Sequence, residues 1–200
     1  MTARLVVLAS GNGTNLQAII DACESKQIEA QVVGVVSDKH EAFALNRAQC
    51  HNVETAVVSA KPHETRQQYD ACLRQIVDMW QPHIIVLAGF MRVLSNSFLS
   101  LFPNQVINIH PALPGELPGT RAIERAFTEF TQGSRNNTGV MVHFVPDEGV
   151  DNGPVITQQT VPIHAADTLV TLEARMHATE HALVIDALQQ LITQQKAPAS

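Results

Sequence analysis

The sequence is poor in cysteine, and its three cysteines lie far apart. Cys23, Cys50 and Cys72 form no Cys-x-x-Cys pair. The N-terminal stretch "MTARLVVLASG" has no long apolar core of the kind found in secretory signal peptides. We therefore expect a chain of the reducing cytoplasm, without a disulfide framework.

Long apolar runs and an excess of positive charge are missing as well. No apolar stretch approaches the roughly 20 residues that a membrane-spanning helix needs. Charged residues make up 16% of the chain and its formal net charge is −6, which argues against general binding to nucleic acid or to an anionic membrane. Hydrophobic residues make up 45%, enough for a sizeable core, and we expect residues 1–200 to form a single domain.

Short apolar runs alternate with helical patterns along the first half of the chain. The expected strands cover residues 5–9, 31–38, 53–59, 83–90 and 105–110. The expected helices cover residues 16–23, 41–49 and 64–80. Strands that are apolar on both faces and alternate with helices predict an α/β fold, with a mostly parallel, twisted, Rossmann-like sheet and helices on both faces.

The pattern changes in the second half. After a helix expected over residues 120–130, two strand patterns at 138–145 and 154–163 follow with only the loop 146–153 between them. With no helix to cross over, they predict an antiparallel addition to the sheet. A long helix is expected over residues 167–195 with a cap at its start, and residues 196–200 are expected to form a frayed tail.

A glycine-rich turn, "SGNGTN", joins the first strand to the first helix, where open α/β folds bind phosphates. Leu16 stands where a dinucleotide fingerprint needs a third glycine, and no Gly-Lys-Ser/Thr follows. A monophosphate suits such a turn better than a pyrophosphate. From the turn alone, a phosphate site and a plain tight turn with Thr14 or Asn15 as helix cap remain equally open.

Polar side chains interrupt the strand "VINIHPALPG". Asn108 and His110 are two residues apart, so they share one face at the strand's carboxyl end. A stiff loop rich in proline and glycine follows, unlike a routine connector. The acidic loop "PDEGVDNGP" carries Asp147, Glu148 and Asp151, any of which would favour a protonated histidine if it reached His110. The sequence alone does not decide whether the loop reaches it.

Other histidines have simpler interpretations. "HATEH" places His177 and His181 one helical turn apart, but the pattern is short and lacks a third ligand, so we expect no metal. Polar contacts from this helix face to a ligand, with Glu180 among them, fit better. His143 lies on an otherwise apolar strand, and we expect it to be a structural histidine with a satisfied hydrogen bond.

Four segments together resemble a known family. "SGNGTNLQAI", "LAGFMRVLS", "VINIHPALPG" and "HFVPDEGVDNGPVI" occur in this order, at about these separations, in the folate-dependent phosphoribosylglycinamide formyltransferases. The resemblance implies their formyltransferase fold and the transfer of a formyl group from 10-formyltetrahydrofolate to glycinamide ribonucleotide in purine synthesis. Two loops depart from the family pattern: "ALPGELPG" replaces a Ser-Leu-Leu-Pro type segment, and the loop before Asp151 is one residue longer.

The resemblance also implies roles for individual residues. The implied catalytic residues are Asn108, His110 and Asp151. The implied ribonucleotide-binding residues are Gly13, Thr14, Asn15 and Glu180. The implied residues for the formyl folate are Arg66, Met91, Arg92, Val93, Leu94 and Asn108. Asn108 and His110 would stabilise a tetrahedral oxyanion, and His110 would carry the proton, with no metal and no covalent nucleophile.

Three other functions compete with this one. A formyltetrahydrofolate deformylase shares the Asn-x-His and Asp set but normally carries an additional N-terminal domain, for which we expect no room before the first strand. A methionyl-tRNA formyltransferase normally adds a basic C-terminal domain, which we do not expect in this acidic chain. A non-enzymatic nucleotide-binding module would leave Asn108, His110 and Asp151 without a purpose. The expected partners are small molecules only, with a monomer and a homodimer both open.

Overall fold

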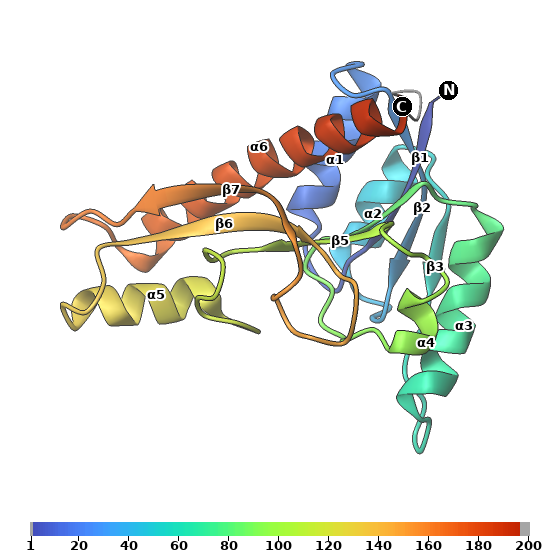
Figure 1. The fold of residues 1–200 in the computed structure, drawn as a ribbon, viewed down its shortest axis with the longest axis horizontal. Helices are drawn as coiled ribbons and strands as arrows, with labels where there is room; N and C mark the ends of the chain where they lie inside the picture. Colours follow the sequence, from blue (N-terminus) through green and yellow to red (C-terminus); the bar gives the residue numbers. More distant parts are fainter. Residues whose placement is uncertain (1, 197–200) are drawn as a thin grey trace.

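The computed structural model describes residues 2–196, and its centre is a seven-stranded sheet with the strand order β3-β2-β1-β4-β5-β6-β7 (Figure 1). The strands are β1 (Ala3–Leu8), β2 (Ala30–Ser37), β3 (Thr55–Val57), β4 (Ile84–Leu87), β5 (Val106–His110), β6 (Asn137–Phe144) and β7 (Val155–Pro162). The first five are parallel, and β6 and β7 are antiparallel to their neighbours. The expected mostly parallel sheet with an antiparallel addition is confirmed.

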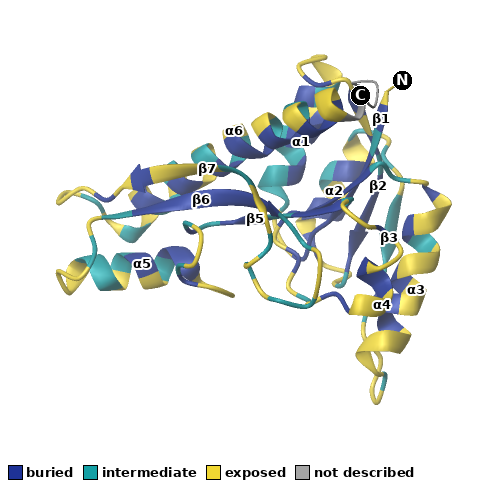
Figure 2. Ribbon diagram, in the orientation of Figure 1, coloured by how far each residue is buried: buried dark blue, intermediate teal, exposed yellow. Residues whose placement is uncertain are grey.

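Helices cover both faces of the sheet, as expected. One face packs against α1 (Thr14–Glu24), α2 (Phe43–Cys50), α5 (Ala122–Thr131) and α6 (Leu169–Lys196). The other packs against α3 (Arg66–Met79) and the short α4 (Asn96–Leu99). Successive side chains of a strand point to opposite faces, so Leu5 and Val7 join the first core and Val6 and Leu8 the second. All four are fully buried, and Figure 2 shows the central strands as buried and the outer helix faces as exposed.

The element boundaries differ most where periodicity is weak. The strand expected over residues 53–59 is reduced to the three residues of β3. The four-residue α4 was not predicted, because one turn is too short to produce a helical period. By contrast, α3 begins at a complete capping box between Thr65 and Gln68, one of the strongest local start signals. Residues 197–200 of the expected tail lie outside the described residues.

The strand order creates a switch point between β1 and β4. From β1 the chain builds β2 and β3 on one side, then crosses to build β4 and β5 on the other. The segments that follow β1 and β4 remain joined, because Ser10 N–H donates to the Gly89 carbonyl at 3.1 Å and Met91 N–H donates to Ser10 Oγ at 2.8 Å. Ligands of open α/β sheets bind outside the carboxyl ends of the strands at such a point.

Within residues 2–196, no helix combines the length and the apolar character needed to cross a membrane. The three cysteines within this range are free thiols.

Candidate active site

A cavity of about 540 Å³ opens at the carboxyl ends of β4 and β5. Its wall is built by segments far apart in the sequence: residues 89–94, 108–111, 119–124 and 145–151, together with side chains of α6. Asn108, His110 and Asp151 all contribute to this wall. The strand end singled out in the sequence and the acidic loop therefore meet at one cavity.

Asp151 joins the two polar residues of β5. Its Oδ1 accepts a hydrogen bond from Asn108 Nδ2 at 2.9 Å, and its Oδ2 lies 3.2 Å from His110 Nδ1. Gly119 N–H also donates to Oδ2 at 2.8 Å. The side chains of His110 and Asp151 are only 4% and 9% exposed, so the contact is largely shielded from water. The loop of residues 146–153 thus reaches His110 despite its extra residue.

The other acidic residues of this loop are engaged elsewhere. Asp147 Oδ1 accepts from Gly149 N–H at 2.7 Å within its own turn. Glu148 forms an ion pair with Arg66 and accepts from Asn96 N–H at 2.8 Å, at the start of α4. Asp151 itself has a left-handed backbone with φ 54°, an uncommon conformation for a residue with a side chain. Asp151 is therefore the acidic residue of this loop that faces the histidine.

Both ring nitrogens of His110 face oxygen acceptors. Nε2 lies 3.1 Å from the Leu117 carbonyl, and Nδ1 faces Asp151. A neutral imidazole has only one N–H, so it would leave one nitrogen lone pair against an oxygen, whereas the imidazolium satisfies both contacts. Burial nevertheless lowers the pKa of His110 below its ordinary value, and it outweighs the raising effects of Asp151 and of the Leu117 carbonyl. Asp151 acts in the expected direction, but the net shift is opposite to it.

The carboxylate shows the complementary balance. Burial by itself raises the pKa of Asp151, but its interactions with His143, Gly119 N–H and the charge of His110 bring the pKa below its ordinary value. Asp151 is therefore an anion at neutral pH. A buried anion requires partners, and the site supplies three kinds: an amide, a backbone N–H and an imidazole.

His143 belongs to this cluster, which the sequence analysis missed. In the antiparallel pair of β5 and β6 it stands opposite Asn108, so both side chains share a face. Its Nδ1 lies 2.8 Å from the Phe144 carbonyl, and its Nε2 lies 3.2 Å from Asn108 Nδ2 and 3.7 Å from Asp151 Oδ1. It has satisfied hydrogen bonds, as expected, but it also lines the cavity. Only the register of β5 against β6 reveals this.

A second polar group enters the cavity from α1 and α6. Glu180 is buried, at 5% exposure, and its Oε2 accepts from Asn15 Nδ2 at 2.9 Å. His177 Nδ1 lies 3.3 Å from the same oxygen, and hydrogen bonding to Glu180 raises the pKa of His177. Asn15 Oδ1 is buried without a hydrogen-bond partner. All three side chains line the cavity, so together they form a polar part of its wall.

The glycine-rich turn borders a second, more open hollow of about 610 Å³, lined in part by Gly11, Lys39 and Arg47. Arg47 fixes the turn by donating to the Asn12 carbonyl at 2.8 Å and to Asn12 Oδ1 at 2.9 Å. Gly13 caps α1 with φ 75°, and a Cβ there would lie 2.8 Å from the Ala44 Cα. Gly13 and Thr14 thus shape the turn, but of the three expected phosphate residues only Asn15 lines the cavity at the ends of β4 and β5.

The expected folate residues separate into two groups. Met91, Arg92, Val93 and Leu94 line the cavity in one continuous segment. The Arg92 guanidinium lies 3.9 Å from the centroid of the Tyr69 ring, which holds the side chain in place. Arg66 is not among the lining residues, because its guanidinium is paired with Glu148. Arg66 therefore contacts the acidic loop, and no local sequence pattern indicates this pairing.

The helical histidine pair does not form a metal centre. His177 has a half-exposed side chain that lines the cavity, whereas Nε2 of His181 is buried without a partner. Among residues 2–196, no three His, Cys, Asp or Glu side chains are grouped so that they could hold a metal ion.

Comparison with known proteins agrees with this geometry. A family model described as formyl transferase matches residues 3–188. The phosphoribosylglycinamide formyltransferase of Dictyostelium discoideum is 42% identical, covering 96% of this chain and 100% of that protein. The human trifunctional purine biosynthetic protein adenosine-3 is 36% identical over 94% of this chain and 18% of its own length. A crystal structure of phosphoribosylglycinamide formyltransferase from Bacillus halodurans has a TM-score of 0.89 at 34% identity, covering 96% of this chain and 97% of that one. The chain belongs to the formyl transferase family.

Proposed function

We propose that this protein is a phosphoribosylglycinamide formyltransferase, which transfers the formyl group of 10-formyltetrahydrofolate to the amine of glycinamide ribonucleotide in de novo purine biosynthesis. One observation carries the proposal: Asp151 contacts both Asn108 and His110 on a cavity wall, in a chain whose full-length relatives bear this name. The family description names only the group that is transferred. The residues of the cavity indicate how the transfer is catalysed.

The proposed reaction requires one bond exchange and one proton transfer. The substrate amine attacks the formyl carbon on N10 of the folate, and the carbonyl oxygen becomes a tetrahedral oxyanion. Asn108 Nδ2 and the His110 ring are the donors placed to stabilise it. The C–N10 bond then breaks, and the proton that the amine loses is carried by His110 to N10. The products are the formylated ribonucleotide and tetrahydrofolate.

The donors of this site contact acceptors of the protein itself. Asn108 Nδ2 contacts Asp151 and His143, and His110 Nε2 contacts the Leu117 carbonyl. A formyl oxygen must therefore take over at least one of these hydrogen bonds. Because an oxyanion is a stronger acceptor than a neutral carbonyl, the exchange favours the transition state over the bound substrate.

The two substrates would occupy different parts of the cavity. The apolar side chains of Met91, Val93 and Leu94 suit the flat ring system of the folate. Asn15 and Glu180 lie on the side nearer the glycine-rich turn, where they suit the ribose hydroxyls, with the phosphate at Gly13, Thr14 and Asn15. The positive charges of Lys39 and Arg47 beside this turn would attract that phosphate within an otherwise acidic protein.

The same assignment implies a single catalytic domain, because one sheet contains all the strands found among residues 2–196. Small molecules are the proposed substrates, and the cytoplasm is the proposed location, since purine synthesis supplies its intermediates there. A monomer and a homodimer are equally compatible with a cavity built from one chain.

Offering two formyl acceptors distinguishes the proposed activity from that of a formyltransferase that acts on RNA. The protein is incubated with 10-formyltetrahydrofolate and either glycinamide ribonucleotide or methionyl-tRNA, and the formylated product is identified by mass spectrometry. Formylation of the ribonucleotide alone is expected. Formylation of the aminoacyl-tRNA alone would overturn the assignment, while leaving the role of the catalytic group intact.

A further inference from the structure

The loop of residues 111–121 touches both members of the His110–Asp151 pair through its backbone. The Leu117 carbonyl faces His110 Nε2 at 3.1 Å, and Gly119 N–H donates to Asp151 Oδ2 at 2.8 Å. The position of this backbone therefore helps to set the orientation of the imidazole and of the carboxylate. A shift of the loop would move a contact at each of them.

This backbone is held in a conformation that it would not adopt alone. Leu117 and Arg121 have left-handed φ values of 44° and 56°. A residue with a side chain rarely adopts this region, and it remains there only when its surroundings fix it. The side chain of Leu117 is buried in the core, and polar contacts of its neighbours restrain the loop further.

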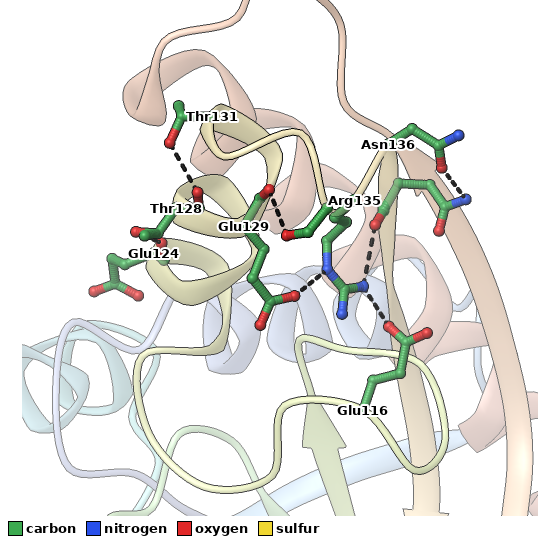
Figure 3. A network of polar contacts seen from close by, with 9 residues as sticks. Glu116, Glu124, Thr128, Glu129, Thr131, Arg135 and Asn136 are labelled. Atoms are coloured by element: carbon green, nitrogen blue, oxygen red, sulfur yellow. Dashed lines mark hydrogen bonds and ion pairs between the residues drawn. The ribbon is translucent and has the colours of Figure 1, made fainter.

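Two arginines bind the loop on either side of Leu117. Arg135, between α5 and β6, donates from Nη1 to Glu116 Oε2 at 2.5 Å (Figure 3). Arg125 of α5 donates from Nη1 to the Pro118 carbonyl at 2.8 Å. The neighbours of Leu117 on both sides are thus anchored to the α5 region, although neither arginine lines the cavity.

Arg135 is the better shielded of the two anchors. Its side chain is 15% exposed, and Figure 3 shows it between Glu116 of the loop and Glu129 of α5. Nε donates to Glu129 Oε2 at 2.7 Å, and Nη1 also reaches the Asn137 carbonyl at 3.2 Å. The Arg135 guanidinium is thus fixed by three acceptors and forms a rigid support. Among the described residues, Glu116 is the only residue of the loop 111–121 to which it is bonded.

We propose that Arg135 is a positioning residue, which through Glu116 holds the Leu117 carbonyl against His110 and the Gly119 N–H against Asp151. This role rests on the proposed function only in the tests that measure catalysis. The hydrogen bond to Leu117 favours the imidazolium, so loosening the loop removes a support of the charged form. The titratable side chains that face the His110 ring are Asp151 and His143.

A matched pair of variants isolates the anchor. Glu116→Gln removes the charge that ties the loop to Arg135, whereas Glu129→Gln removes the other carboxylate of the same arginine without touching the loop. The two carboxylates are similarly exposed, at 35% and 39%. We expect Glu116→Gln to lower kcat roughly tenfold and to move the imidazolium-dependent limb of the pH profile to lower pH. Glu129→Gln should leave both within about twofold.

NMR titration of the His110 ring in the same proteins gives a readout that does not depend on activity. The pKa of His110 should fall in Glu116→Gln and stay at the wild-type value in Glu129→Gln. Equal shifts in both variants, or no shift in either, would overturn the positioning role. A wild-type protein that formylates no ribonucleotide would overturn the proposed function, while the titration still decides the role of Arg135.

Thermal unfolding verifies that each variant is folded. If Glu116→Gln is not, Arg135→Lys is measured in the same way, since it retains the cation but loses the forked contact to both glutamates. A lower His110 pKa in Arg135→Lys supports the anchor, and an unchanged pKa contradicts it.

Discussion

His110 is a buried residue whose ring lies between two oxygen acceptors, and burial, Asp151 and the Leu117 carbonyl are the largest influences on its charge. Burial disfavours the imidazolium, while Asp151 and the Leu117 carbonyl favour it. Because these effects oppose one another, a bound ligand that displaces one partner of the ring changes the pKa of His110. A histidine that must give up a proton and take one back needs such a balance.

Replacement of Asp151 tests this balance at the scale of one side chain. Asp151→Asn keeps the shape but removes the charge that raises the pKa of His110, so that pKa should fall further. Activity that requires the imidazolium is lost as pH rises through this pKa, so the loss should begin at lower pH in the variant. The rate should fall by roughly 10²-fold or more, as is typical of lost acid–base and electrostatic support.

Two neighbours in the loop provide the control for that prediction. Asp147→Asn and Glu148→Gln remove charges that are directed away from His110, so their effects on the pH profile should be small. His110→Ala should cost at least as much as Asp151→Asn, and the double variant should lose less than the product of the two losses. Near-normal activity in Asp151→Asn, together with an inactive Asp147 or Glu148 variant, would contradict the assignment.

Glu180 supports a separate prediction about the ribonucleotide. Glu180→Gln should raise the KM for glycinamide ribonucleotide about tenfold or more, because hydrogen bonds to charged groups are among the stronger ones. The KM for the folate should stay nearly constant. Glu173, which also lines the cavity from α6 but is not part of the Asn15–Glu180 contact, is the matched control. An equal rise in KM for Glu173→Gln would indicate a general effect of charge.

Single residues differ in how far the sequence revealed them. Asn108 and His110 were recognisable because strand alternation places them on one face, and this rule is local. His143 was classified as structural because its partner depends on the pairing of β5 with β6, which sequence periodicity does not define. The pairing of Arg66 with Glu148 joins residues 82 positions apart, and no local rule reports such a contact.

At the scale of elements, the junction of β1 and α1 shows how packing limits a test. Gly13 adjoins α2 so closely that any side chain there would displace Ala44. In a Gly13 variant, a loss of ligand binding could therefore not be separated from a loss of folding. Gly11 has no atom within 4 Å of an added Cβ, and it borders the hollow beside Lys39 and Arg47. A side chain at Gly11 would therefore occupy the space proposed for the phosphate.

Gly11→Val should weaken binding of glycinamide ribonucleotide without weakening binding of the folate. Steric exclusion of the phosphate is the reason, and calorimetry with each ligand separately is the measurement. Loss of affinity for both ligands in a folded variant would show that the turn has only a structural role. Full affinity for both would place the phosphate elsewhere.

Elements with strong local signals were predictable, and elements defined by their surroundings were not. The capping box at Thr65 and the apolar runs of β1 and β4 follow from nearby residues. The length of β3 is set by its pairing with the end of β2, and α4 is a single turn. The loop conformation at Leu117 depends on arginines from α5 and from the turn after it.

At the scale of the whole molecule, the switch point between β1 and β4 brings the distant segments together. The parallel strands place the turn at residues 10–15, the segment at 89–94 and the end of β5 along one edge, and α6 and the antiparallel pair complete the wall. Alternating strands and helices predicted this architecture, because right-handed crossovers leave few alternatives. The cavity itself was not predictable, because its wall depends on the paths of two irregular loops.

The central claim is that the protein transfers a formyl group to an amine and does not release it to water. The most direct measurement follows tetrahydrofolate formation from 10-formyltetrahydrofolate by absorbance, with and without glycinamide ribonucleotide. Turnover should depend on the ribonucleotide and saturate with it, and should be almost absent without it. Turnover at the same rate without the ribonucleotide, with formate as the product, would instead identify a deformylase.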